Sequence, residues 1–215
     1  MIRWHWLGRA SYRRVLADQL ALRERVWAGG DGAVLLCEHP PVITLGRSAT
    51  AANILDAGDV PIERIDRGGE VTYHGPGQLM IYPVVRIGST GAFLAAAGGA
   101  IAAACEALGV RGAAWRRDPA GVWIGDAKLA ACGIHVAHGV SVHGFALDVD
   151  TPASAWARIR ACGLDLPHVS IARALAGGSP GRASSGAQSS GHSLDVIAAA
   201  IEVGPRVAAA LPLVR

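Results

Sequence analysis

The amino-acid sequence predicts the α/β (α+β) class, with helices flanking a central mixed, largely antiparallel β-sheet. Three apolar segments at 122–124, 128–136 and 140–149 follow one another through short turns, which is typical of neighbouring antiparallel strands. Helical patterns lie before and after them in the chain, at 90–108 and 193–210. Helices on both sides of a run of strands favour a sheet covered by helices.

The first half of the chain combines one helix with several short extended segments. Apolar residues at helical spacing continue to Trp27, and Gly29-Gly30 provide a stop. Pro40 and Pro41 divide two extended runs, because proline cannot donate a hydrogen bond to a sheet ladder. In chain order we expect a helix over 10–27, strands over 33–37, 42–46 and 61–66, a glycine-rich loop over 67–78, and a buried strand over 79–85.

The second half adds small-residue helices and one segment of low complexity. The alanine-rich helix at 90–108 carries Gly98-Gly99, which favours close packing against a sheet, and Thr90 is its expected N-cap. After the three strands we expect short helices at 152–159 and 169–175 and a last helix that begins at Ser193 and ends near Ala210. The glycine- and serine-rich segment 176–192 is expected to be mobile.

Composition and charge indicate a cytoplasmic protein that forms one domain over residues 1–215. The mean hydropathy of +0.32 reflects the many alanines, and no segment has about 18 continuous apolar residues. The first residues lack the apolar region of a secretory signal. A net charge of +3 is too weak to imply nucleic acid and is compatible with an acidic protein partner. We therefore expect neither a nucleic-acid nor a membrane partner.

The glycine-rich stretch 67–78 is the segment around which the rest of the chain is interpreted. Its glycines allow positive φ and let another molecule approach the main chain closely. Arg67 adds a fixed cation, and His74 can exchange a proton near neutral pH. We expect this stretch to form the wall of a binding site and not to pack in the core. The alternative is an ordinary glycine-rich turn.

The four cysteines are widely spaced and do not suggest a disulfide framework. Cys37 and Cys105 lie in apolar runs and are expected to pack as small hydrophobes. Cys132 precedes Gly133 in a strand, where it can line a site without reacting. Cys162 lies in a predicted loop near Arg158 and Arg160, where positive charge favours a thiolate. This local pattern alone does not decide between a nucleophile and an unreactive thiol.

Lys128 begins a strand after a tight turn, and two interpretations of it remain open. A lysine there is commonly a solvated charge at a strand edge. If its side chain instead points into a site, its ammonium group can stabilise a thiolate and exchange protons.

Several other chemistries find no support in the sequence. The eight histidines form none of the paired clusters with cysteine that are typical of zinc sites. The phosphate-loop pattern G-x-x-x-x-G-K-[ST] and the serine-nucleophile pattern G-x-S-x-G are absent. We therefore expect neither a metal nor a cofactor.

Five separated motifs resemble, in the same order, those of the octanoyltransferases of lipoate biosynthesis, over residues 10–175. They are Glu38-His39-Pro40-Pro41, the stretch 67–78 with Tyr82-Pro83, Lys128-Leu129-Ala130 with Gly133-Ile134, the run 141–149, and Cys162-Gly163. The resemblance implies the mixed-sheet fold of lipoate and biotin protein ligases. It also implies transfer of an octanoyl group from octanoyl-acyl carrier protein to a lysine of lipoyl domains. Those acceptors belong to 2-oxoacid dehydrogenase complexes and the glycine-cleavage H protein.

The resemblance also implies roles for individual residues. Cys162 corresponds to the nucleophile that accepts the acyl group, and Lys128 to its partner in a Cys/Lys dyad. The walls around the acyl chain correspond to Arg67, Gly68, Gly69, Glu70, Val71, Thr72, Tyr73 and His74, to Ala131, Cys132 and Gly133, and to Gly144, Phe145 and Ala146.

Three features depart from the family pattern. Ala161 precedes the proposed nucleophile where the family usually has proline, Cys132 replaces an aliphatic residue, and the segment 176–192 is longer and richer in serine. Two other functions remain open alternatives. One is an ATP-dependent lipoate or biotin protein ligase, which needs no cysteine nucleophile. The other is an acyl-binding module without turnover.

Overall fold

The computed structural model describes residues 2–161, 166–177 and 195–212. Within them, seven strands form a large sheet in the order β1-β2-β6-β10-β9-β8-β7, and three form a small sheet in the order β4-β3-β5. The large sheet consists of β1 (Arg3–Arg9), β2 (Ala33–Glu38), β6 (Gln78–Val84), β7 (Ala113–Arg117), β8 (Ala120–Ile124), β9 (Ala127–Ala137) and β10 (Val140–Asp148). The small sheet consists of β3 (Val42–Leu45), β4 (Ile62–Arg64) and β5 (Val71–His74).

The large sheet is mixed and mainly antiparallel, as predicted, whereas the separate small sheet was not predicted. In the large sheet β1 pairs with β2 in parallel, and the other pairs are antiparallel. In the small sheet β3 is parallel to β4 and antiparallel to β5. The predicted meander of three strands is confirmed as β8, β9 and β10, because tight turns at Gly125 and Gly139 bring each strand back along its neighbour.

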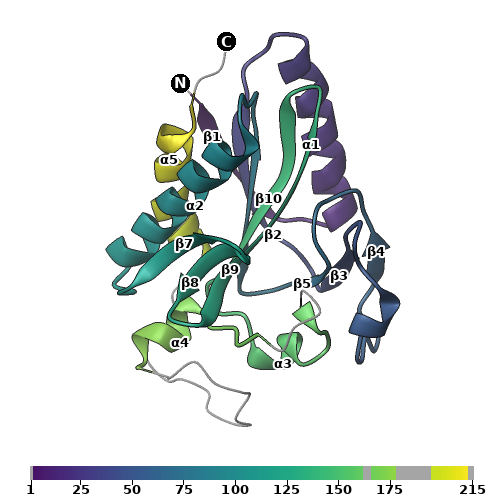
Figure 1. Cartoon of the computed structure of the whole chain (residues 1–215), viewed down its shortest axis with the longest axis vertical. Coiled ribbons are helices and arrows are strands. Elements are labelled where there is room, and N and C mark those ends of the chain that lie inside the picture. The colour runs from purple at the N-terminus through teal and green to yellow at the C-terminus, as the bar shows by residue number, and fades with distance from the viewer. Residues whose placement is uncertain (1, 162–165, 178–194, 213–215) are drawn as a thin grey trace.

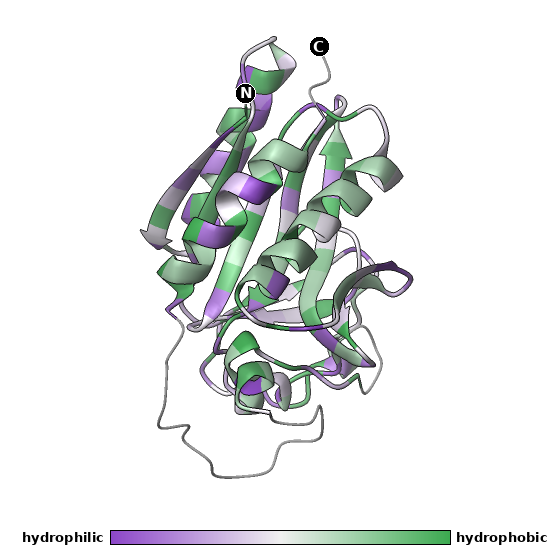
Figure 2. Cartoon of the chain, turned by 90° about the vertical axis from the view of Figure 1, so that its left-hand side faces the viewer, coloured by the Kyte–Doolittle hydropathy of each residue, from purple (hydrophilic) through white to green (hydrophobic). Residues whose placement is uncertain are grey.

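Helices cover both faces of the large sheet (Figure 1). Helix α1 lies on one face, where Val15 packs against residues of β2 and β6, and α2 and α5 lie together on the other face. The helices and the one 3-10 turn among the described residues are α1 (Tyr12–Trp27), η1 (Ala51–Asn53), α2 (Thr90–Ala107), α3 (Ala153–Trp156), α4 (Ile171–Leu175) and α5 (Val196–Ala210). The view in Figure 2, coloured by hydropathy, shows polar residues among the apolar ones along these helices.

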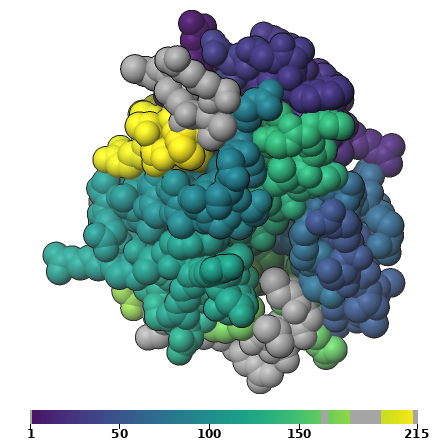
Figure 3. Space-filling view, turned by 45° about the horizontal axis from the view of Figure 1, so that its top comes forward, coloured from purple at the N-terminus to yellow at the C-terminus, as the bar shows by residue number. Residues whose placement is uncertain are grey.

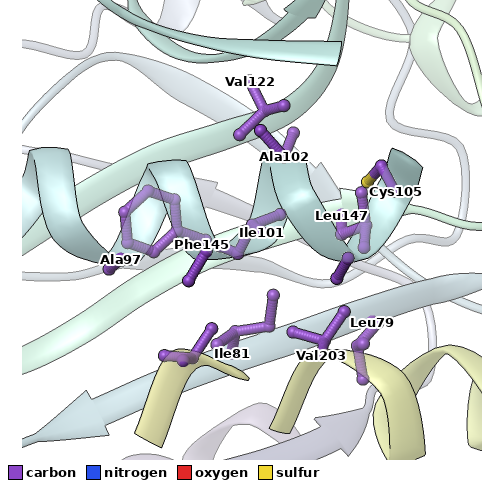
Figure 4. Close-up of a cluster of buried hydrophobic side chains, with 14 of the residues drawn as sticks. Leu79, Ile81, Ala97, Ile101, Ala102, Cys105, Val122, Phe145, Leu147 and Val203 are labelled. Atoms are coloured by element: carbon purple, nitrogen blue, oxygen red, sulfur yellow. The ribbon is translucent and has the colours of Figure 1, made fainter. Parts of the chain in front are cut away.

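The main core lies between the large sheet and the pair α2 and α5. Ile101 of α2 and Val203 of α5 meet Phe145 and Leu147 of β10 in a fully buried cluster (Figure 4). By length and composition α2 could cross a membrane, but its buried side belongs to this core, and core helices of soluble proteins pass the same test. Small residues bring α2 close to the sheet, as predicted at Gly98, where a Cβ would lie 2.2 Å from the Trp115 ring.

Several sequence-based expectations need correction. The stretch 67–78 is not simply a loop, because Val71–His74 forms strand β5, and Val71 and Tyr73 pack in a second core cluster. Helix α2 is capped by Ser89 and not Thr90, since the Ser89 hydroxyl accepts a hydrogen bond from the Ala92 amide. The last helix is capped by Asp195; Ser193 and residues 178–192 lie outside the described residues.

Two edge strands, β1 and β7, were not predicted from the sequence. Strand β1 alternates exposed and half-buried residues, with arginine at both ends, so its apolar signal is weak. Strand β7 ends in two exposed arginines. Both strands occupy edges of the large sheet, where only one neighbour and one face provide burial.

Candidate active site

A cavity opens between the large and small sheets, and most of the residues predicted as site walls line it. Its empty volume, part of which is open to solvent, is about 610 Å³. In the space-filling view, the small sheet (blue) lies to one side of β10 (green) (Figure 3). The predicted residues that line the cavity are Arg67, Gly69, Glu70, Val71, Thr72, His74, Lys128, Ala131, Cys132, Gly133, Gly144, Phe145 and Ala146.

Three predicted residues are not part of the described lining. Gly68 lies behind the wall, where its amide donates a 3.0 Å hydrogen bond to the Ile134 carbonyl. The Tyr73 ring points into the small-sheet core, with its centroid 6.4 Å from that of Trp156. Cys162 lies outside the described residues, although Ala161, which precedes it, lines the cavity.

The buried Arg67 guanidinium holds the segment before β5 against β3 at the cavity wall. Its Nη2 donates to the carbonyl and hydroxyl oxygens of Thr44 at 3.0 and 2.9 Å, and its Nη1 donates to the Gly68 carbonyl at 2.9 Å. Strand β9 approaches so closely that a Cβ on Gly133 would lie 2.9 Å from the Gly68 carbonyl oxygen. A Cβ on Gly144 would lie 2.0 Å from the Ile81 carbonyl oxygen. These glycines are therefore required by close backbone approach.

Two buried histidines of the cavity lining, His74 and His143, and the buried His39, which is not in the lining, are uncharged near neutral pH. Burial lowers the pKa of His74 to about 3 and that of His143 to about 4, and it also lowers the pKa of His39. His39 donates through Nδ1 to the Ala10 carbonyl at 2.6 Å, so its Nε2 accepts from the Tyr82 hydroxyl at 2.9 Å. Neutral rings let His74 and His143 border an apolar ligand without a buried charge.

Lys128 is not a solvated edge charge, because only 2% of its surface is exposed and it lines the cavity. Its Nζ lies 4.8 Å from the centroid of the Trp123 ring, a cation–π geometry. Its backbone pairs with the segment on the far side of Cys162 in sequence: the Lys128 amide donates to Pro167, and the Lys128 carbonyl accepts from Val169. The lysine amine is thus held at the cavity by both its strand and its side-chain contacts.

The three described thiols are poor nucleophiles. Burial raises the pKa of Cys132 to about 12, although the Lys128 charge acts in the opposite direction, and it raises the pKa of Cys105 to about 12 as well. The pKa of Cys37 is raised further by burial. Cys132 therefore lines the cavity as a protonated thiol at neutral pH.

Several lining residues were not predicted from the sequence: Tyr12, Met80, Tyr82, His143, Ala161 and His168. Of these, His143 has φ of +61°, which is uncommon outside glycine, and its Nδ1 lies 3.3 Å from the Tyr12 hydroxyl oxygen. His143 belongs to the run 141–149, whose Ser-x-His-Gly pattern could have indicated it. Tyr12 and His168 carried no comparable local signal.

Chemically, the cavity combines apolar side chains and glycine main chain with uncharged histidines, the Arg67 guanidinium and the Lys128 amine. Among the described residues no group of three histidine, cysteine, aspartate or glutamate side chains could hold a metal ion. The site is therefore best suited to hold an apolar chain beside a group that exchanges protons.

Comparisons with known proteins agree with this architecture. Residues 11–178 match the family model of the lipoyl protein ligase A/B catalytic domain. The chain is 42% identical to an octanoyltransferase of Solibacter usitatus, covering 77% of this chain and 80% of that protein. It is 39% identical to an octanoyltransferase of Gloeobacter violaceus, covering 81% and 76%.

Solved structures agree with the fold. Lipoate-protein ligase A bound with ATP superposes with a TM-score of 0.69 at 15% identity, covering 80% of this chain and 76% of that one. Ta0514 from T. acidophilum, a lipoate protein ligase homologue with bound lipoic acid, superposes with a TM-score of 0.63 at 17% identity, covering 81% and 83%. At such identities these structures establish the architecture alone.

Proposed function

Because the chain belongs to the octanoyltransferases of the lipoyl protein ligase A/B catalytic family, we propose that it carries the octanoyl group as a thioester on Cys162. Octanoyl-acyl carrier protein is the proposed donor. The proposed acceptors are lipoyl domains of 2-oxoacid dehydrogenase complexes and the glycine-cleavage H protein, reached in the cytoplasm. The predicted wall residues that line the cavity would hold the acyl chain.

The observation that carries this proposal is the buried position of Lys128 in the cavity, paired through its backbone to Pro167 and Val169. Cys162 lies between Ala161, which lines the cavity, and that paired segment. The described residues that precede and follow Cys162 in the sequence therefore lie at the site, which supports a role for this cysteine there. The raised pKa values of Cys132 and Cys105 leave Cys162 as the cysteine suited to attack.

A further observation concerns the choice of lysine. Lys128 is the only lysine in the sequence, and the other 19 of its 20 basic Lys and Arg residues are arginines. An arginine would supply the same charge, but its guanidinium does not give up a proton in proteins. The presence of an amine at this buried position supports a role that includes proton exchange.

The chemistry proceeds in two balanced halves. In the first, the Cys162 thiolate attacks the donor thioester, and the expelled carrier thiolate takes a proton from the Lys128 ammonium. One thioester replaces another, so this half needs no separate activation of a carboxylate. In the second, Lys128 takes a proton from the incoming lysine ammonium, the resulting amine attacks the acyl-enzyme, and the thiolate leaves beside the recharged Lys128. The attacking nitrogen loses its second proton to solvent as the neutral amide forms.

The test supplies octanoyl-acyl carrier protein without ATP and follows the enzyme and a lipoyl domain by intact-protein mass spectrometry. We expect the enzyme to gain one octanoyl mass that hydroxylamine removes, and the mass to pass to the lipoyl domain. Cys162→Ser should abolish the adduct, whereas the matched control Cys132→Ser should keep it.

Other outcomes identify the alternatives. Loss of the adduct in Cys132→Ser alone would overturn the assignment of the nucleophile. Strict dependence on ATP and free octanoate would indicate a ligase. An octanoylated enzyme that never passes the group on would indicate an acyl-binding module.

A further inference from the structure

His168 is a buried imidazole at the cavity for which the two halves above provide no role. Its side chain is 7% exposed, it lines the cavity, and it stacks on Trp156 with ring centroids 3.7 Å apart. Within the described part of the chain, neither ring nitrogen has a hydrogen-bond partner. Buried polar groups without a partner are rare and costly, so this ring is suited to contact a ligand or to exchange a proton.

A buried carboxylate lies beside this ring. Asp148 Oδ2 is 3.6 Å from His168 Nδ1, and Asp148 Oδ1 accepts a 2.9 Å hydrogen bond from Gln78. Gln78 in turn accepts a 2.8 Å hydrogen bond from His74 through its Oε1. The carboxylate is therefore oriented from one side and free on the other to stabilise positive charge on the imidazole.

The backbone fixes His168 next to Lys128. His168 forms a parallel bridge with Lys128, and both side chains line the same cavity. Among the described charged groups, Asp148 from β10 lies beside the His168 ring, and Lys128 from β9 lines the same cavity. The Asp148 carboxylate favours a protonated His168 and the Lys128 ammonium disfavours it, so Asp148 would offset the charge of Lys128 when His168 gains a proton.

Amide formation from a thioester requires one more proton acceptor than Lys128 provides. The incoming lysine arrives as an ammonium ion and must lose two protons before the neutral amide remains. Lys128 takes the first and keeps it to pair with the departing thiolate. The second, carried by the nitrogen after attack, must leave the site for solvent.

We propose that His168, oriented by Asp148, accepts this second proton from the attacking nitrogen and passes it to solvent. Each turnover then converts a thioester and an ammonium ion into an amide, a free carrier thiol and one released proton, and the enzyme returns to its starting state. This inference rests on the proposed function and adds a catalytic residue to its second half. Imidazole is well suited to this role because it exchanges protons near neutral pH.

The test separates the two halves. Octanoyl-enzyme formation on Cys162 and transfer from isolated octanoyl-enzyme to a lipoyl domain are each measured in single turnovers between pH 5.5 and 9. His168→Gln should leave formation within about twofold and slow transfer about 100-fold at neutral pH. The transfer profile should also lose an ionisation that the unaltered chain shows. Trp156→Phe, which keeps an aromatic ring beneath position 168, should transfer at close to the normal rate.

A second variant distinguishes a role in transfer from a general loss of folded protein. Asp148→Asn retains the imidazole and should slow transfer more than formation. Equal loss in both halves, or an unchanged shape of the transfer profile in His168→Gln, would overturn the role of His168. If the unaltered chain forms no octanoyl adduct on Cys162, the proposed function falls first, and this inference falls with it.

Discussion

The amide of Lys128 donates a 2.8 Å hydrogen bond to the carbonyl oxygen of Pro167, and the Lys128 carbonyl accepts a 3.0 Å hydrogen bond from Val169. The start of β9 is thereby joined to the segment that follows Cys162 in the chain. Because a chain extends only about 3.3–3.6 Å per residue, an anchor this near in sequence limits how far Cys162 can lie from Lys128. The backbone thus supports a single site for two residues that are distant in sequence.

If Lys128 stabilises the Cys162 thiolate, its replacement should make that thiolate harder to form. In Lys128→Met, which keeps the apolar stem without the charge, we expect alkylation of Cys162 to need a pH higher by about one unit or more. The measurement is the rate of iodoacetamide modification of the Cys162 peptide as a function of pH. Arg116→Ala is the matched control, because Arg116 also lies over the Trp123 ring, 5.3 Å from its centroid, but is partly exposed. An unchanged profile in Lys128→Met would remove Lys128 from the dyad.

The native chain should show one reactive thiol at pH 8. Burial raises the pKa of Cys105 and Cys132 to about 12 and that of Cys37 as well, so only about one in ten thousand of the first two thiols is ionised at that pH. We expect brief iodoacetamide treatment followed by peptide mass spectrometry to find label at Cys162 alone. Treatment in urea should label all four cysteines. Native labelling of Cys132 as fast as Cys162 would contradict the burial argument.

The parts of the fold that follow from local rules could be predicted from the sequence. Tight turns at Gly125 and Gly139 fix the meander β8–β10, and helical spacing fixes α1. Strand β5 was missed because its partner is β3, far back in the chain, and a short strand in a glycine-rich segment shows little alternation. Such pairing depends on tertiary contacts that a local pattern does not contain.

The candidate site divides in the same way. Its walls could be predicted because they belong to sequence motifs that contain characteristic glycines and an arginine, such as Gly133 and Arg67. Tyr12 was placed within an ordinary helical pattern, and only the packing of α1 against β10 brings its hydroxyl to His143. His168 could be identified only from its contacts with Asp148 and Trp156. Asp148 is distant in the sequence, and Trp156 lies in a short helix with no pattern that indicates a site.

Neighbouring glycines of α2 should respond oppositely to the same substitution. A Cβ on Gly98 would lie 2.2 Å from the Trp115 ring, so Gly98→Ala should displace that ring and lower the free energy of unfolding by about 1–3 kcal/mol. Gly99 has no heavy atom within 4 Å of the corresponding position, so Gly99→Ala should raise that free energy by about 0.5–1 kcal/mol through helix propensity. Urea denaturation of the two variants measures both changes. Equal effects would mean that α2 does not face the sheet as described.

Stability should fall on mild acidification because buried histidines are held neutral. Burial lowers the pKa of His143 to about 4 and that of His74 to about 3, whereas in the unfolded chain a histidine binds a proton below about pH 6.5. The unfolded state therefore takes up more protons as the pH falls. The stability contributed by neutral His143 is complete above pH 6.5 and is lost progressively towards pH 4.

At pH 5 this loss amounts to about 2 kcal/mol for each such histidine at most, since each pH unit below 6.5 contributes about 1.4 kcal/mol. Urea denaturation of the unaltered chain and of His143→Asn at pH 7 and pH 5 checks this figure. Asparagine tolerates the positive φ of +61° at this position but does not titrate. The variant should therefore lose less stability between the two pH values, by about 2 kcal/mol. Parallel losses in the two proteins would show that His143 is not held neutral by burial.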